Sequence, residues 1–528
     1  MTDATIFADE PRKLEWIGVT PRQLAGFIAM VFGMFMAILD IQIVSASLQE
    51  IQAGISASAD EIPWVQTAYL IAEVVMIPLS GFLGRVFSTR ALFVTAAIGF
   101  TAASALCATA TTINEMIVYR AIQGFIGGGM IPSVFAVAFS LFPRSKQNIV
   151  SPIIGLVATL APTIGPTVGG YLTDTYSWHW LFLINVIPGI LVATAVFFLV
   201  DFDKPNYALL DKFDYVGLLG MALFLGSLEY VLEEGPRYDW FDDQTIATFG
   251  VLTVIGALVF FWRAFTAAEP IVQLRAFKDR NFAFGSAFSF TMGIGLYGLT
   301  YVYPVYLGQV RGYDSLMIGQ TMFVTGVAMF LTAPISGRLA GKVDPRIMML
   351  IGFMGFAVGT YIATYITSDW DFWELLIPQI LRGSSLMLCM VPITNLSLGT
   401  LPPEQIKNAS GLFNLTRNLG GAVGLAMINT ILNKRLDLHL ARLHEQVSWG
   451  QPVAEERLAT MQQNFTTAMH ADGEMAALKK LAMIVRNQAN VLSFADLFLV
   501  LTVLFVSAGF FTLLMRKPAP VPAGAGGH

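Results

Sequence analysis

A carboxylate stands in the first long apolar stretch of this sequence. Asp40 lies within residues 23–47, which otherwise carry no charged side chain and are long enough to cross a bilayer. A charged side chain at the centre of a membrane span costs about 2.5–3.5 kcal/mol even on lenient scales. Such a residue usually faces a cavity, has a partner and takes part in moving something. Asp40 is therefore the first candidate functional residue.

Other charged side chains also fall inside apolar stretches. Arg120, Arg382 and Arg417 are the arginines that remain there once the loops are assigned, and Glu73 is the second clear intramembrane acid. At 1.5 Å per helical residue, Asp40 and Arg120 lie about 10 and 8 Å from the same face, so the two could meet in one layer. Glu73 and Arg382 lie about 15 Å deep, near the midplane. 

A buried Asp–Arg pair of this kind could load and release protons. Burial disfavours the ionised carboxylate whereas a nearby arginine favours it, so together they can bring protonation into the working pH range. Arg120 keeps its own charge and would act on Asp40 as a fixed tuning charge. The alternative is a static ion pair that holds the first span to the fourth. Glu73 could share the proton, or it could attract a cationic substrate.

Composition places the chain among integral membrane proteins. Of its 528 residues, 55% are hydrophobic and 13% are charged, against about 25% charged in a soluble domain. A net charge of −5 in so apolar a chain gives no indication of nucleic-acid binding. Both cysteines lie in apolar spans and the five histidines are scattered, so we expect no disulfide, no metal site and no cofactor.

Hydrophobic stretches of about 20 residues predict an all-α membrane fold. We count fourteen spans, at 23–47, 63–83, 91–110, 115–141, 148–173, 181–200, 214–232, 244–265, 281–308, 316–340, 346–367, 372–398, 408–433 and 494–515. Lys and Arg concentrate in one alternate set of short loops, and the other set carries only Arg237 and Arg311. This asymmetry predicts that both termini face the cytoplasm.

The sequence also repeats itself. Pro78–Arg90 and Pro334–Arg346 share Pro-x-Ser-Gly-x-Leu, with an arginine nine residues after the glycine, and the match aligns span two with span ten. Two six-span halves with two extra spans between them would give this register, as in secondary transporters whose halves rock around a central site. We assign the cytoplasmic gates to residues of these two loops: Gly81, Arg85, Arg90, Gly337 and Arg346.

The domain boundaries follow from the repeat. We expect a cytoplasmic tail, an N-terminal half, two inserted spans with linkers, a C-terminal half and a second cytoplasmic tail, at 1–22, 23–200, 201–280, 281–515 and 516–528. Inside the C-terminal half, the long outward loop 434–493 has apolar residues at helical spacing and is predicted to be helical. It either packs on itself as a cap or receives a partner.

Span five contains a second kind of signal, the segment Ala161–Asp174 (APTIGPTVGGYLTD). Gly165, Gly169 and Gly170 remove side chains from one face, and Pro166 costs a helix hydrogen bond and permits a bend. This pattern predicts a close-packed hinge between the halves, although simple close helix packing would use the same residues.

Six short motifs are distributed along the spans. They are Leu39-Asp40-x-x-Ile43-Val44, Trp64-Val65-x-Thr67-x-Tyr69, Arg120-x-x-Gln123-Gly124, Gly165-Pro166-x-x-Gly169-Gly170, Trp178-x-Trp180-x-Phe182-x-Ile184-Asn185 and Asn414-x-x-Arg417-x-x-Gly420-Gly421. With them, nearly the whole chain resembles the major facilitator superfamily, and within it the EmrB type of the fourteen-span drug/proton antiporter family. The resemblance implies proton-driven multidrug efflux, with Asp40 and Arg120 tied to proton coupling and the span-five motif to antiport.

The resemblance further implies a place in a larger assembly. The EmrB type resembles the bacterial inner-membrane part of a three-component pump, with a periplasmic adaptor and an outer-membrane channel as partners and the proton gradient as energy source. The loop 434–493 would then face the adaptor. The chain departs from the family where Arg85 replaces an acid and Ser88 replaces a glycine in the loop after span two. That departure puts the usual charge-relay gate of this loop in doubt.

Our prediction is a proton antiporter that exports hydrophobic and amphipathic compounds. We assign five residues to the substrate cavity: Gln123, Tyr69, Arg382, Asn395 and Arg417. An alternative is a dedicated exporter of one native metabolite, siderophore or lipid-like molecule. An intramembrane enzyme is disfavoured because the spans show no nucleophile–base pair and no metal-ligand cluster, and a receptor is disfavoured because no signalling domain is present. Oligomeric state is not indicated.

Overall fold

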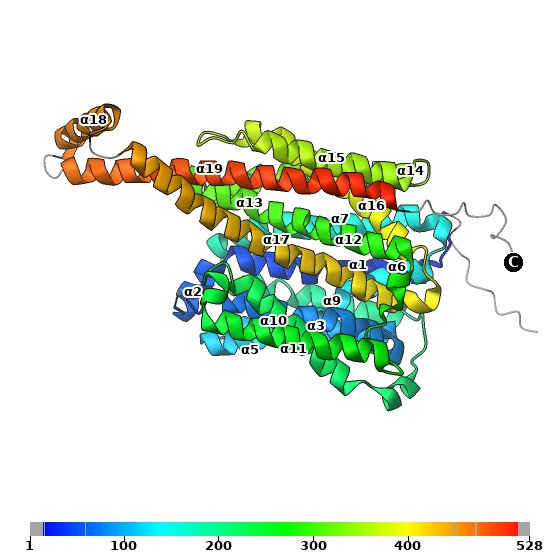
Figure 1. Cartoon of the computed structure of the whole chain (residues 1–528). Helices are drawn as coiled ribbons and strands as arrows, with labels where there is room; N and C mark the ends of the chain where they lie inside the picture. The colour runs from blue at the N-terminus through cyan, green and yellow to red at the C-terminus, as the bar shows by residue number, and fades with distance from the viewer. Residues whose placement is uncertain (1–13, 15, 59, 448–449, 470–472, 516–528) are drawn as a thin grey trace, which may run out of the picture.

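The computed structural model describes residues 14, 16–58, 60–447, 450–469 and 473–515. Every regular element within these residues is a helix. Figure 1 shows long helices side by side in one bundle, beyond which α17 (Pro403–Gln446), α18 (Pro452–Met469) and α19 (Gly473–Phe511) project at one end. The predicted tail 516–528 lies outside the described residues, as does most of the predicted tail 1–22.

The first half of the bundle contains the predicted spans one to six. Thr20 begins the first helix with a reciprocal capping box to Gln23, and Pro21 follows at the first helical position. Gly128 and Gly129 divide span four into two helices. The elements are α1 (Pro21–Ala46), α2 (Leu48–Ile55), α3 (Trp64–Phe87), α4 (Thr89–Cys107), α5 (Ile113–Gly127), α6 (Met130–Leu141), η1 (Arg144–Lys146), α7 (Gln147–Thr175), α8 (Trp180–Leu183) and α9 (Val186–Leu199).

The inserted spans and the second half follow. Span nine is continued through two short π-helical turns, η5 and η6. The elements are η2 (Tyr207–Lys212), α10 (Tyr215–Glu234), η3 (Trp240–Asp242), α11 (Gln244–Thr266), η4 (Leu274–Lys278), α12 (Arg280–Gly293), η5 (Ile294–Gly298), α13 (Leu299–Tyr306), η6 (Leu307–Arg311), α14 (Ser315–Ala340), α15 (Pro345–Ala363), α16 (Phe372–Leu398), α17 (Pro403–Gln446), α18 (Pro452–Met469), α19 (Gly473–Phe511) and η7 (Thr512–Leu514).

Thirteen of the described segments are long and apolar enough to cross a membrane. The remaining predicted span, 408–433, is the first part of α17, which is less apolar because it contains Asn408, Asn414, Arg417 and Asn418. This part of α17 packs against α3, α6 and α12 inside the bundle. The structure therefore agrees with the predicted all-α membrane fold and its fourteen spans.

The two inserted helices occupy different environments. α10 packs against α11, and it also contacts α3 of the first half and α17 of the second, so it lies across a seam between the halves (Figure 1). Of the most apolar 18-residue segment of α11, only 17% is buried. An apolar helix that is exposed in this way suits contact with lipid.

The two ends of the bundle differ. We call the end that carries the loops of Arg85, Arg144, Lys342 and Lys407 the basic end. At the opposite end, the extension end, α17 and α19 run past the other helices and α18 packs against α19 (Figure 1). Asp496 Oδ2 of α19 lies 2.8 Å from His439 Nε2 and 3.5 Å from Arg435 Nε, both on α17. Most of the described part of 434–493 is helical, as predicted.

The internal repeat has a structural counterpart at the basic end. A Cβ atom at Gly81 of α3 would lie 2.9 Å from the carbonyl oxygen of Lys407, at the start of α17. A Cβ at Gly337 of α14 would lie 2.6 Å from the carbonyl oxygen of Asn148, at the start of α7. Each repeat glycine therefore lets its helix approach the backbone of the opposite half at an equivalent position.

Candidate functional site

Asp40 and Arg120 form a completely buried ion pair. Arg120 Nη1 donates to Asp40 Oδ2 at 2.7 Å, and both side chains have an exposed fraction of 0%. The other carboxylate oxygen, Oδ1, accepts from Asn185 Nδ2 at 2.6 Å and from Gln123 Nε2 at 3.1 Å. The sequence-based pairing of spans one and four thus matches the geometry, and three side chains donate to one carboxylate.

Arg120 is held on its other sides by the second span. Its Nε donates to the carbonyl oxygen of Val65 at 3.2 Å, and its guanidinium carbon lies 4.3 Å from the centre of the Tyr69 ring. Phe182 lies on another side, at 5.8 Å. Aromatic faces attract a desolvated cation, so Arg120 is fixed by α3 and by the aromatic residue of α8 as well as by Asp40.

Two members of this cluster were missed as site residues in the sequence. Asn185, between α8 and α9, was only the last residue of a motif, and Ser104 of α4 was not singled out. Ser104 Oγ accepts from Gln123 Nε2 at 2.7 Å and from Asn185 Nδ2 at 3.5 Å. An amide inside the otherwise apolar stretch 180–199 was a usable signal for Asn185, because an unpaired amide is expensive in hydrocarbon. A lone serine in a span carries no such signal.

Glu73 lies in a different place from the Asp40 cluster. It lines a cavity of about 70 Å³ together with Glu229 and Glu233 of α10, and the wall is completed by residues of α1, α3, α17 and η5: Ile41, Gln42, Gln66, Leu70, Val74, Tyr297, Asn418, Gly421, Ala422 and Leu425. α1 and α3 thus contribute residues both to the Asp40 cluster and to the cavity wall. Whether Glu73 shares the proton with Asp40 remains a prediction.

The residues that we assigned to the substrate cavity do not line the cavity of Glu73. Arg382 donates to Thr300 and, at 3.4 Å, to Gln379, and its guanidinium carbon lies 5.8 Å from the Tyr303 ring centre. Arg417 donates to Asn414 Oδ1 at 2.7 Å and lies over Phe135. Both arginines are buried, with exposed fractions of 2%. Their predicted role in the substrate path stays a prediction, as does that of Gln123 and Tyr69, which belong to the Asp40 cluster.

Asn395 lies at the basic end, where it joins the two halves. Its Nδ2 donates to Asn148 Oδ1 at 3.2 Å, and its Oδ1 accepts from Ser151 Oγ. Asn148 and Ser151 belong to α7 of the first half, whereas Asn395 belongs to α16 of the second. The assigned cavity residue is therefore a contact between halves in this state.

The glycines of span five bring α7 against α1 beside the ion pair. A Cβ at Gly165 would overlap Gln42, and a Cβ at Gly169 would lie 2.9 Å from the carbonyl oxygen of Ile43. Gly170 is also buried, and Pro166 lies inside the helix. On another side α7 packs against α14 of the second half. The glycines therefore provide close helix packing inside the first half, and the predicted hinge between the halves stays a prediction.

The arginines of the repeated loops have different kinds of partner in the described chain. Arg85 lies 5.4 Å from the Phe82 ring centre, Arg90 is 4.0 Å from Asp201, and Arg346 is 2.9 Å from Asp344. Ser88, which stands where the family has a glycine, has φ +78°. That backbone conformation favours glycine, so the loop retains its shape although the preferred residue is absent.

A different cation connects the halves at the basic end. Lys407 Nζ of α17 donates to the carbonyl oxygen of Gly84 at 3.0 Å and to the carboxylate of Asp203. Asp203 also accepts from the N–H of Thr89 at 3.0 Å and from its hydroxyl at 2.9 Å. The sequence analysis used Lys407 only for orientation and did not consider Asp203. Nothing local in the sequence indicated their pairing.

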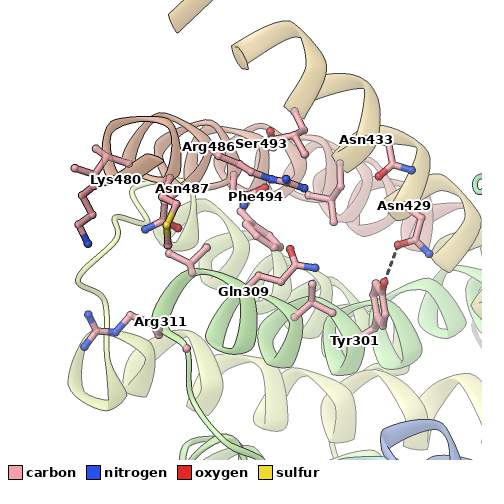
Figure 2. Close-up of a pocket in the computed structure, with 18 residues that line it drawn as sticks. Tyr301, Gln309, Arg311, Asn429, Asn433, Lys480, Arg486, Asn487, Ser493 and Phe494 are labelled. Carbon is pink, nitrogen blue, oxygen red and sulfur yellow. Dashed lines mark hydrogen bonds between the residues drawn. The ribbon is translucent and has the colours of Figure 1, made fainter. Parts of the chain in front are cut away.

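A larger groove lies at the foot of the extension, between η6, α17 and α19 (Figure 2). Its volume is about 770 Å³, and its basic side chains are Arg311, Lys480 and Arg486. Among its lining residues, Tyr301 donates to Asn429 Oδ1 at 2.8 Å. Arg311 is 3.6 Å from Asp371, whose pKa is lowered by the hydrogen bond from Tyr313 and by the N–H of Phe372.

Two related helical halves around a buried ion pair and an intramembrane cavity define a membrane transporter. The chain belongs to the Major Facilitator Superfamily, whose family model matches residues 30–425. It is 42% identical over 505 residues to the colistin resistance protein EmrB of Acinetobacter baumannii, covering 95% of this chain and 98% of the relative. It is 30% identical to the multidrug export protein EmrB of Escherichia coli K12, covering 95% and 96%. The chain is therefore an EmrB-type member of the superfamily.

More distant comparisons agree on the fold. The fatty acid resistance protein FarB of Neisseria gonorrhoeae is 28% identical over 502 residues, covering 95% of this chain and 97% of the relative. Among solved structures, the human organic anion transporter MFSD10 superposes with a TM-score of 0.58 at 12% identity, covering 92% and 100%. A bacterial homologue of the lysosomal transporter Spinster, in an inward-facing state, gives 0.54 at 15% identity, covering 96% and 100%.

Proposed function

We propose that this protein is a proton-driven exporter of hydrophobic and amphipathic toxic compounds in a bacterial inner membrane. The observation that carries the proposal is the buried pair of Asp40 and Arg120, in which a carboxylate inside the bundle receives three side-chain donors. The names of the relatives support the cargo, since they refer to colistin resistance, multidrug export and fatty acid resistance.

The coupling would use Asp40 as the proton carrier. In the state described here, contacts of Lys407 and Asn395 join the halves at the basic end, and the cavity of Glu73 lies between mid-depth and the extension end. Protonation would remove the negative charge that holds Arg120, Gln123 and Asn185 together. Because α1 carries both Asp40 and two cavity residues, a change at the carboxylate would be transmitted directly to the cavity wall.

Orientation and partners complete the proposal. The basic end would face the cytoplasm, because lysine and arginine favour that side. The extension formed by α17, α18 and α19 would then project into the periplasm, where it could contact the adaptor of a three-component pump. Hydrophobic small molecules and protons would be the ligands of the permease itself.

Transport into everted membrane vesicles tests the coupling. The wild-type protein should accumulate a substrate when a pH gradient is imposed and should stop when an uncoupler collapses it. Asp40→Asn keeps the size of the side chain but cannot carry the proton, so we expect gradient-driven accumulation to disappear while expression and gel-filtration behaviour stay normal. Accumulation by Asp40→Asn at the wild-type level would refute the proton-carrier role.

The relative named for fatty acid resistance favours a second candidate, a dedicated exporter of one lipid-like molecule. The same vesicles separate the two candidates. A drug exporter should transport several unrelated compounds that compete with one another. A dedicated exporter should transport one compound class, with the others neither transported nor competing.

A further inference from the structure

The cavity of Glu73 offers acceptors and acids to a ligand. Three carboxylates, from Glu73, Glu229 and Glu233, line it, and no lysine or arginine is present among its described lining residues. Glu73 and Glu229 have exposed fractions of 2% and 5%. Carboxylates at this depth require a compensating charge or a proton, and the wall itself supplies no cation.

Two polar atoms of this wall point to a missing ligand. Glu73 Oε1 and Gln66 Oε1 are buried and have no hydrogen-bond partner in the described structure. Leaving a buried acceptor unpaired is unfavourable, and more so for a charged group. A group that donates hydrogen bonds or carries positive charge would satisfy both atoms.

The nearest buried cations, Arg120 and Arg417, bond mainly to groups outside the cavity, although Arg120 Nη2 and Arg417 Nε and Nη1 have no hydrogen-bond partner in the described structure. Arg120 donates to Asp40, Gln123 and the Val65 carbonyl oxygen. Arg417 directly precedes the cavity residue Asn418, and it bonds to Asn414 and to the cavity residue Tyr297 and lies over the face of Phe135. Neither arginine lines the cavity, so the three carboxylates together exceed the positive charge that the wall presents.

The arrangement suits an organic cation better than a metal ion. Within the described residues, no group of three His, Cys, Asp or Glu side chains is close enough to hold a metal, so the carboxylates surround a volume rather than a point. That volume has room for roughly five waters, comparable to a small organic ammonium head group. Ile41, Leu70, Val74, Ala422 and Leu425 add apolar contacts.

The inserted helix α10 supplies much of this negative charge. Glu229 and Glu233 are four residues apart, so they lie on one helical face. That face reaches the cavity because α10 packs against α3 and α17 across the seam between the halves. The residue directly after Glu229, Tyr230, stacks on Trp64 with ring centres 5.4 Å apart, which anchors the helix to α3.

We propose that this cavity binds the ammonium head group of monovalent organic cations, and that the inserted helix α10 gives the transporter this preference through Glu229 and Glu233. The inference deepens the proposed function, because the bound cation would be one class of exported substrate. Binding itself requires neither a proton gradient nor Asp40, so the two proposals can fail separately.

Equilibrium binding to the purified full-length protein tests the site. Radiolabelled benzyltrimethylammonium is the direct ligand, and two isosteric competitors, cationic choline and neutral 3,3-dimethylbutan-1-ol, differ in charge alone. We expect choline to compete at least tenfold more effectively. Glu229→Gln and Glu73→Gln should each weaken benzyltrimethylammonium binding at least fivefold while leaving the weak competition by the neutral isostere unchanged.

Two control variants match these changes. Glu234→Gln removes the next acid of α10, which bonds to Thr67 and does not line the cavity, and Arg486→Gln alters the basic groove of Figure 2 instead. Both should keep the affinity within twofold. If Glu229→Gln does not fold, Glu233→Gln provides the same test at a less buried position.

Three results would overturn the inference. The two isosteres could compete equally well, the variants of Glu73 and Glu229 could keep the wild-type affinity, or the variants could weaken competition by choline and by the neutral isostere to the same extent. The proposed antiport has its own test in the vesicles. Charge-selective binding without gradient-driven transport would reject antiport and support the cation site. Antiport of neutral compounds without charge-selective binding would support antiport and reject the cation site.

Discussion

Lys407 of the second half reaches the carbonyl oxygen of Gly84 in the first half and the carboxylate of Asp203 in the linker that follows that half. Asp203 follows α9, and it also accepts from the N–H and hydroxyl of Thr89 at the start of α4. This arrangement places an acid beside the loop in which Arg85 stands where the family has an acid. A buried or half-buried ion pair that also accepts backbone hydrogen bonds is stronger than an isolated surface pair.

The first prediction concerns this contact between halves. Lys407→Gln should weaken the contact between the halves at the basic end, because it removes the positive charge that is bonded to Asp203 and to the carbonyl oxygen of Gly84. Ser133 lines the same narrow space, and its exposed fraction is 6%. A cysteine introduced in its place should then react several-fold faster with a maleimide. The measurement uses a background in which the buried Cys107 and Cys389 are replaced by alanine.

Controls for this prediction use other lysines and a conservative change. Lys407→Arg should keep labelling near the parent rate, and Lys342→Gln, in the loop after α14, should have no effect. Asp203→Asn should reproduce Lys407→Gln, and the double variant should add little. Additive effects of the two changes would show that the side chains do not act as a pair.

The second prediction concerns Asn185, a positioning residue that donates to Asp40 at 2.6 Å. Asn185→Ala removes a hydrogen bond to the ionised carboxylate, and such bonds contribute about 1.5–3 kcal/mol. This bond favours one protonation state of Asp40, so the pH profile of vesicle transport should change when it is removed. Ser104→Ala, which changes a neighbour not bonded to Asp40, should shift it less. An unmoved profile in Asn185→Ala would argue against control by this bond.

The third prediction concerns the contact of α7 with α1. Gly169→Ala places a methyl group 2.9 Å from the carbonyl oxygen of Ile43 and 3.1 Å from Ser47 Oγ. We expect a loss of about 1–3 kcal/mol from this overpacking, visible as a lower midpoint in thermal unfolding of the purified protein. Gly226→Ala is the matched control inside another span, because its nearest contact, Ile71 Cγ2, lies at an ordinary 3.4 Å. Equal midpoints for the two variants would contradict the prediction.

The fourth prediction concerns the extension. Replacing α18 (Pro452–Met469) by a short Gly/Ser linker leaves the bond between His439 and Asp496 that holds α17 to α19. Transport by everted vesicles, which needs only the permease, should be retained. Drug resistance of whole cells that contain the adaptor should fall, because the tip would no longer contact it. Full resistance with α18 removed would exclude that contact.

Several features could be derived from the sequence because they depend on local chemistry. The spans follow from runs of apolar residues, and α17 was recognised as a span although its asparagines make it less apolar than the other thirteen. The pairing of Asp40 with Arg120 followed from residue counting, since each helical residue advances a fixed 1.5 Å. The repeat placed Gly81 and Gly337 in equivalent positions, where both approach the opposite half.

The rest was decided by tertiary structure, because it joins residues far apart in the chain. Asn185 meets Asp40 across 145 positions and Lys407 meets Asp203 across 204, and no periodicity or depth estimate selects such partners. Glu229 reads in the sequence as an acid near a span end, yet α10 turns it into the cavity of Glu73. Hydrophobicity determines which segments enter the membrane, whereas only the packing of those segments determines which polar side chains share a site.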